Sequence, residues 1–129
     1  MSSDFYGRGA GYPLRIGPSG GVEESAGVRK VEGSIRMILG TQYGERAMRP
    51  DFGCNLRSLV FAPNNESTAG LARHYVEEGL HRWEPRIELL RVDVRNDNTA
   101  GRLLIEIQYR LRSTPDIHNL VYPFYLEKP

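Results

Sequence analysis

The segment RVDVRNDNTAGRLLIEIQYRL, residues 91–111, decides the fold because it holds two runs with a period of two on either side of a turn. In the first run, Leu90, Val92 and Val94 alternate with charged residues, as in a strand with one buried face. The second run places five apolar side chains on one side: Leu103, Ile105, Ile107, Tyr109 and Leu111. Asn, Asp and Gly in between are turn residues. The segment therefore predicts a β-hairpin.

A third strand is predicted over residues 117–126, which continue the period of two. Its regularly spaced apolar residues are Leu120, Tyr122, Phe124 and Leu126. Pro123 interrupts the run, and proline cannot donate a hydrogen bond to a ladder. We therefore expect this strand to lie at an edge of the sheet or to end at the proline.

An amphipathic helix is predicted over residues 28–39, ahead of the hairpin, and Gly40 is well placed to end it. Its apolar residues recur at helical spacing: Val28, Val31, Ile35, Ile38 and Leu39. The run that follows, residues 41–56, contains glycines and a proline that prevent a long regular element. A short helix across Leu56 to Phe61 is compatible with the sequence.

A second helix is predicted over about residues 68–83, with Asn65 or Ser67 able to accept its free amides. Along one side it places Leu71, Ala72, Tyr75, Val76, Leu80 and Trp83. Pro85 disfavours helical geometry at Glu84, so the helix must finish at about Trp83.

These elements predict an α+β domain in which two helices cover one face of a small antiparallel sheet, a hairpin plus a C-terminal strand. A chain of 129 residues is most simply one domain. Residues 1–27 hold seven of the fourteen glycines and are interpreted as a Gly-rich arm that does not fold alone. Residues 28–129 would form the domain. Within the arm, YPLRIG alternates enough to become a strand if an edge is offered.

The composition excludes several classes of protein. With 40% hydrophobic and 26% charged residues and no apolar stretch of about 20 residues, no membrane span is expected. A formal charge of +1 supplies no electrostatic footprint for nucleic acid. The N-terminus lacks a secretory signal, so we expect synthesis and assembly in the cytoplasm. The lone Cys54 is interpreted as a small packed residue.

No metal or cofactor is expected. His74 and His81 are two turns apart on the predicted helix, roughly 10 Å along the axis and too far to bind one metal together. No nucleotide-binding, zinc-protease or serine-hydrolase motif occurs. The three histidines are interpreted as surface residues.

Glycoside hydrolysis needs two carboxyl groups, one with a raised pKa. Glu45 and Glu84 are the candidates, and each lies beside an arginine, Arg46 or Arg86. A nearby cation lowers the pKa of a carboxyl group, which is wrong for a general acid. A peptidoglycan-cleaving, lysozyme-like enzyme is therefore the weaker alternative.

The junction Trp83–Arg86 admits two interpretations. One is a helix stop followed by a solvated ion pair; Gly44–Arg46 likewise suits a turn with a local pair. The other starts from geometry, since residues two apart in an extended chain point to the same side. Glu84 and Arg86 would then project together from a proline-fixed corner beside the only tryptophan, a pattern typical of a binding hot spot.

Four motifs in consistent order resemble the baseplate-wedge, sheath-initiating proteins of contractile tails. They are SIRMILGTQYGERAMRPDFG (34–53), LVFAPN (59–64), WEPRIELLRVDV (83–94) and LLIEIQYRL followed by NLVYPF. The similarity covers roughly residues 13 to 126. Such proteins occur in contractile phages, type VI secretion systems and phage-like extracellular injection particles, and the sequence does not separate the three.

The resemblance implies an architectural part without enzymatic activity or cofactors, present in six copies per particle. The wedge bundle would be bound by Trp83, Glu84, Pro85 and Arg86. A structural loop would comprise Gly44, Glu45, Arg46, Arg49, Pro50, Phe52 and Gly53. Sheath subunits would add a strand to the sheet and template the first sheath ring, at residues Leu103, Ile105, Ile107, Tyr109, Leu120, Tyr122 and Phe124.

Overall fold

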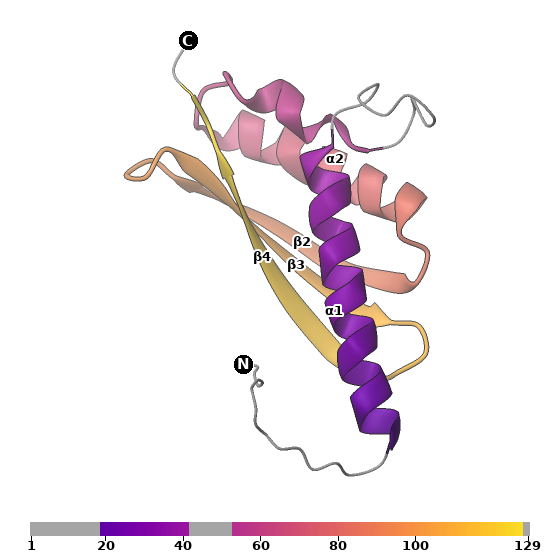
Figure 1. The fold of residues 1–129 in the computed structure, drawn as a ribbon. Coiled ribbons are helices and arrows are strands. Elements are labelled where there is room, and N and C mark those ends of the chain that lie inside the picture. Colours follow the sequence, from indigo (N-terminus) through magenta and orange to yellow (C-terminus); the bar gives the residue numbers. More distant parts are fainter. Residues whose placement is uncertain (1–18, 42–52, 128–129) are drawn as a thin grey trace. The chain divides into compact units, whose positions relative to one another are not determined.

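The computed structural model describes residues 19–41 and 53–127 (Figure 1). The chain divides into two units, residues 1–30 and 31–129. In the first unit the described part is helical, the beginning of α1 (Ser19–Gly40). The second unit contains the end of α1 and the remaining elements, which are η1 (Asn55–Leu59), α2 (Glu66–Trp83), β2 (Ile87–Asp97), β3 (Arg102–Leu111) and β4 (Ile117–Tyr125).

The three strands form one antiparallel sheet in the order β2-β3-β4. Ile107 in the central strand pairs with Val92 of β2 and with Leu120 of β4. The five apolar residues predicted to share one side of β3 are all buried. The predicted hairpin is confirmed, and β4, which contains Pro123, is an edge strand as expected.

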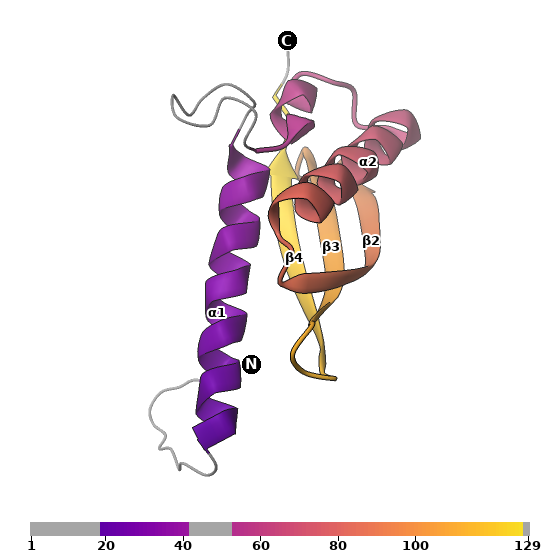
Figure 2. The ribbon, with the colours of Figure 1, turned by 90° about the vertical axis from the view of Figure 1, so that its right-hand side faces the viewer.

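One helical layer covers one face of this sheet. Figure 2 shows α2 and the 31–40 part of α1 on the same side of the strands. Tyr109 of β3 is fully buried beneath that layer and donates a hydrogen bond to Glu32 of α1, at 3.4 Å. The predicted α+β class is confirmed. In the described part of the chain, no helix is long and apolar enough to cross a membrane.

The first strand differs from the prediction at Leu90. The pairing of β2 with β3 shifts between Leu89 and Arg91, which marks a β-bulge. A bulge inserts one unpaired residue, so the alternation predicted from Leu90 through Val94 is interrupted. Leu90 is 37% exposed, while Ile87 and Val92 are buried. Placing Leu90 on the buried face was therefore wrong.

The first helix is longer than predicted, because α1 begins at Ser19 and not at Val28. Residues 19–27, which their glycine content places in the arm, are helical. The run VEESA in this stretch contains Glu and Ala, which favour helices. The high glycine content of residues 1–27 as a whole hides this local signal. The end at Gly40 is confirmed, and Val31, Ile35, Ile38 and Leu39 are buried. The rest of the arm, including YPLRIG, lies outside the described residues.

The second helix ends at Trp83 as predicted, and it begins at Glu66, two residues before the predicted start. The Asn65 side chain accepts a hydrogen bond from the backbone N–H of Thr68, at 3.0 Å, and Trp83 is the last helical residue. Leu71 is 46% exposed, so its predicted place on the packed side was wrong. The buried stripe runs instead through Ala69, Ala72, Val76, Gly79 and Leu80. Small residues let α2 approach its neighbours closely, and Leu71 lies two residues, about 200°, from Ala69 on the helix.

Candidate functional site

The junction between α2 and β2, residues 83–86, is the corner that the sequence singled out. Glu84 caps α2 with non-helical angles (φ −126°, ψ 76°), and its backbone N–H donates to the carbonyl of Leu80 at 2.9 Å. Pro85 and Arg86 are exposed, and β2 begins directly afterwards at Ile87. The chain therefore changes from helix to strand within three residues.

Glu84 and Arg86 form a two-point ion pair. The Arg86 Nε donates to Glu84 Oε1 at 2.8 Å, and Nη2 donates to Oε2 at 2.8 Å. The Arg86 backbone N–H adds a third bond to Oε1 at 3.3 Å. The two side chains therefore lie on the same side, as the geometric argument predicted. The Glu84 side chain is only 1% exposed against 52% for Arg86, so the pair is not simply solvated.

The environment of Glu84 keeps its carboxylate ionised. Burial by itself raises the pKa of Glu84, but hydrogen bonds from Arg86 and Ser34, together with the charge of Arg86, lower it below its ordinary value. Ser34 belongs to α1, so this carboxylate joins α1 to the corner. A buried, ion-paired carboxylate with a lowered pKa cannot serve as a general acid. The other candidate acid, Glu45, lies outside the described residues.

The corner is also fixed to the connection between β3 and β4. The backbone N–H of Arg112 donates to the Arg86 carbonyl at 3.0 Å, and the Arg112 Nε donates to the Pro85 carbonyl at 2.9 Å. Pro85 adds a fixed φ angle to these bonds. The exposed corner is therefore rigid before it meets any partner.

Trp83 contributes less exposed surface than the sequence suggested. Its side chain is half-buried, and the guanidinium of Arg82 lies over its ring, 5.0 Å from the centroid. A cation over an indole face is favourable. Within residues 82–86, the exposed surface belongs to Arg82, Pro85 and Arg86.

Of the predicted structural loop, only Gly53 is among the described residues. Gly44, Glu45, Arg46, Arg49, Pro50 and Phe52 lie outside the described residues. Gly53 is buried and has φ +111°, and a Cβ there would lie 2.3 Å from the Thr41 carbonyl oxygen. The next residue, Cys54, donates its backbone N–H to the same carbonyl at 3.0 Å. Glycine is therefore required at residue 53, which packs against Thr41 just after the end of α1.

The cysteine beside this glycine is a packed residue, as predicted. Cys54 is fully buried, and burial raises the pKa of its thiol to about 11. A thiol with so high a pKa is unreactive at neutral pH.

The predicted site of strand addition must be divided between two strands. Leu103, Ile105, Ile107 and Tyr109 lie on β3, whose two sides are already paired with β2 and β4. A central strand has no free backbone groups for another strand, so the prediction of strand addition is carried by the residues on β4. Leu120, Tyr122 and Phe124 lie on the edge strand β4, with Leu120 and Phe124 buried and Tyr122 half-buried.

The two edges of the sheet differ. β4 has no charged residue, and its outward face exposes Ile117, Val121 and Tyr125. β2 carries five charged side chains and the bulge, and α2 packs against it. Charges and bulges are features that block strand pairing at an edge. Between the two edges, β4 is the one suited to accept a strand.

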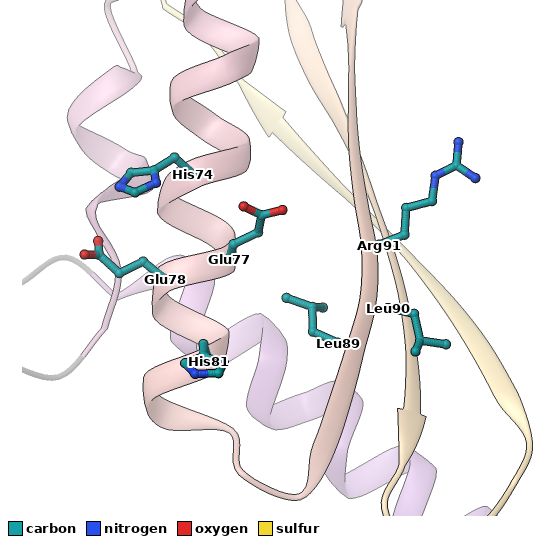
Figure 3. Close-up of a pocket in the computed structure, with 7 residues that line it drawn as sticks. All are labelled: His74, Glu77, Glu78, His81, Leu89, Leu90 and Arg91. Carbon is teal, nitrogen blue, oxygen red and sulfur yellow. The ribbon is translucent and has the colours of Figure 1, made fainter.

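A shallow groove of about 400 Å³ lies between α2 and β2 (Figure 3). From α2 it is lined by His74, Glu77, Glu78 and His81, and from β2 by Leu89, Leu90 and Arg91. Figure 3 shows Leu89 pointing towards α2 and Leu90 and Arg91 pointing to the other side of the strand. His74 and His81 are exposed, as predicted. Across residues 19–41 and 53–127, no group of three or more His, Cys, Asp or Glu could hold a metal ion.

Two residues that support the corner, and one that supports the hairpin, were missed from the sequence. Ser34 and Arg112 bind the corner from other elements. Asn64 donates to the carbonyls of Asp97 and Arg102, at 3.2 and 3.3 Å, and so joins the start of α2 to the hairpin. Asn64 ends the motif LVFAPN and Ser34 begins the motif at residues 34–53, whereas Arg112 lies in no motif. The contacts that Ser34 and Arg112 make join residues far apart in the chain, and no local pattern predicts them.

Comparisons with known proteins match the chain to a family model described as baseplate wedge protein gp25, over residues 25–116. The baseplate wedge protein gp25 of Enterobacteria phage T4 is 32% identical over 95 residues, which cover 74% of this chain and 72% of the phage protein.

Two solved structures have a similar fold. A Geobacter sulfurreducens crystal structure, described as a candidate tail lysozyme, is 49% identical with a TM-score of 0.71 and covers 90% of this chain and 98% of its own. A chain from the anti-feeding prophage baseplate has the same fold, with 21% identity, a TM-score of 0.52 and coverage of 78% and 70%.

Proposed function

The chain belongs to the baseplate wedge protein gp25 family, and we propose that it joins the baseplate wedge of a contractile tail-like particle to the sheath. It is a structural baseplate component, and its partners are other baseplate subunits. The finer proposal assigns one surface to each side of this joint. The exposed corner at residues 83–86 binds the wedge, and the free edge of β4 meets the sheath.

The observation that carries the wedge contact is the two-point Glu84–Arg86 pair on a buried carboxylate. Glu84 is too buried to touch a partner, so it acts by fixing the direction of Arg86. Pro85 and Arg86 are exposed and make the contact, and the half-buried Trp83 packs beneath Arg82. A surface already held in its bound geometry loses little entropy on binding.

The sheath contact is proposed at β4. An extended arm of a sheath subunit adds a strand along residues 117–125, where main-chain hydrogen bonds supply the affinity. An uncharged edge with exposed Ile117 and Val121 supports this assignment. Six copies, assembled in the cytoplasm and arranged by the baseplate, would then template the first sheath ring.

A test of the wedge contact must separate the role of the Glu84–Arg86 charges in binding from their role in folding. Arg86→Ala alone leaves a buried carboxylate without its main partner, which destabilises the domain whatever its partners do. The double variant Glu84→Gln/Arg86→Gln removes both charges and retains groups able to hydrogen-bond. We expect it to stay folded by circular dichroism and to abolish sheathed particles counted by electron microscopy. Normal sheath assembly from the double variant would exclude this role for the corner.

Cell-wall cleavage is the rival function, and the description of the Geobacter relative makes it worth testing. The buried, ion-paired Glu84 argues against it. A turbidity assay on cell walls should show no activity for the wild-type chain. Activity that disappears in Glu45→Gln or Glu84→Gln would overturn the structural assignment.

A further inference from the structure

A second arginine shares the corner surface. Arg112, in the connection after β3, is exposed and holds Pro85 and Arg86 through their carbonyl oxygens, at 2.9 and 3.0 Å. No sequence motif includes it, and it belongs to a different element from the Glu-Pro-Arg triplet. Arg112 and Arg86 therefore flank the exposed Pro85 from two segments of the chain.

Of the charged groups around Pro85, Arg82 is stacked on the Trp83 ring, whereas Arg86 and Arg112 keep N–H groups for a partner. Glu84 is buried and bound on both oxygens by Arg86. The charge of Arg112 also lowers the pKa of Glu88, but the Glu88 carboxylate is hydrogen-bonded to Arg110. Within the described residues, Nη1 of Arg86 and both Nη atoms of Arg112 have no hydrogen-bond partner.

Each guanidinium group is hydrogen-bonded within the domain along one of its own sides. Arg86 is fixed through Nε and Nη2 to Glu84, and Arg112 is fixed through Nε to Pro85. Each therefore presents its remaining N–H groups in a set direction, and such a fork matches the two oxygens of a carboxylate. Two fixed arginines on a chain with a formal charge of +1 suit a few carboxylates better than a polyanion, which needs a broad basic surface.

We propose that Arg112 is a second partner-binding residue of the corner, and that Arg86 and Arg112 together bind acidic side chains on a wedge subunit. This inference rests on the proposed function of the corner, and it adds both a residue and the chemistry of the partner. Binding depends on the charge of Arg112, so it weakens as salt screens that charge.

The test uses baseplates from cells that lack this chain, to which purified variants of the full chain are added. Bound protein is measured by sedimentation with the baseplates at low and at physiological salt. We expect Arg112→Glu to weaken binding by about tenfold or more and Arg112→Lys to weaken it much less. Arg112→Gln should reduce the dependence of binding on salt, which a purely structural role for Arg112 would not change.

Arg95→Glu is the matched control, because Arg95 is an exposed arginine on β2 and carries the same change of charge. It should bind like the wild type. Binding of Arg112→Glu at wild-type strength, while Glu84→Gln/Arg86→Gln fails to bind, would overturn this inference and leave the proposed function standing. Wild-type binding by both variants would overturn the proposed function as well.

Discussion

A Cβ atom added at Gly79 of α2 would lie 2.6 Å from the Cβ of Cys54. The same atom would meet Ile38 of α1 at 3.6 Å, so Gly79 lies where α2, α1 and the segment before η1 converge. The contact is with Cβ, close to the backbone, and cannot be relieved by rotating a flexible side chain. Close approach at this position requires glycine.

Gly79→Ala should therefore destabilise the domain, although alanine favours helices over glycine by about 1 kcal/mol. We expect a loss of about 1–3 kcal/mol in the free energy of unfolding, as for other overpacked cores. Urea denaturation measures it. Gly70→Ala is the control, because Gly70 lies on the same helix with nothing within 4 Å of its Cβ, and it should be neutral or stabilising. Equal effects at both positions would contradict the packing argument.

Asn64 provides a second test of packing at the far end of the hairpin. Its amide donates to the carbonyls of Asp97 and Arg102, and its oxygen accepts a bond from Asn96 at 2.8 Å. Asn64→Ala should cost about 1–3 kcal/mol, because part-buried groups lose their partners. Asn64→Asp should be no better, since a carboxylate cannot donate to two carbonyls. Urea denaturation measures the free energy of unfolding of both variants. Asn98→Ala, in the exposed turn, is the neutral control.

The buried pair at the corner predicts how stability depends on pH. The pKa of Glu84 is lowered from its ordinary value of 4.5, so the folded state favours the ionised carboxylate. Its contribution to stability is fully present above pH 4.5 and is lost as the pH falls through the lowered value. The difference in free energy of unfolding between wild type and Glu84→Gln should shrink in that acidic range. A difference that stays constant with pH would show that Glu84 is not ionised in the fold.

The free edge of β4 is tested by adding a charge to it. Val121→Lys changes a side chain that is 50% exposed, so unfolding should shift by no more than about 0.5 kcal/mol. A lysine on an edge strand opposes strand pairing, so sheathed particles should become rare in electron micrographs. Asn98→Lys, in the exposed turn, should leave assembly unchanged. Wild-type numbers of sheathed particles with Val121→Lys would move the sheath contact away from β4.

The sequence predicted those parts of the fold whose cause is local. Alternation predicted the buried face of β3, Asn65 was one of two candidate caps of α2 beside Ser67, and Pro85 predicted the end of that helix. Leu90 was misplaced because a bulge is set by pairing with β3 and leaves no local mark. The site divides in the same way. The neighbours Glu84 and Arg86 were placed on one side, whereas Ser34 and Arg112 reach the corner only through tertiary contacts.

The bulge at Leu90, on the edge strand β2, has a consequence for the opposite edge strand, β4. With β2 interrupted by the bulge and lined with charges, and β3 paired on both sides, β4 is the edge best suited to accept another strand. On the proposed function, each copy would have a valence of one in the sense of polymer growth, because it would accept a strand at one edge. A subunit of this kind would start a row of sheath subunits and set its direction, and the number of copies would fix how many rows begin.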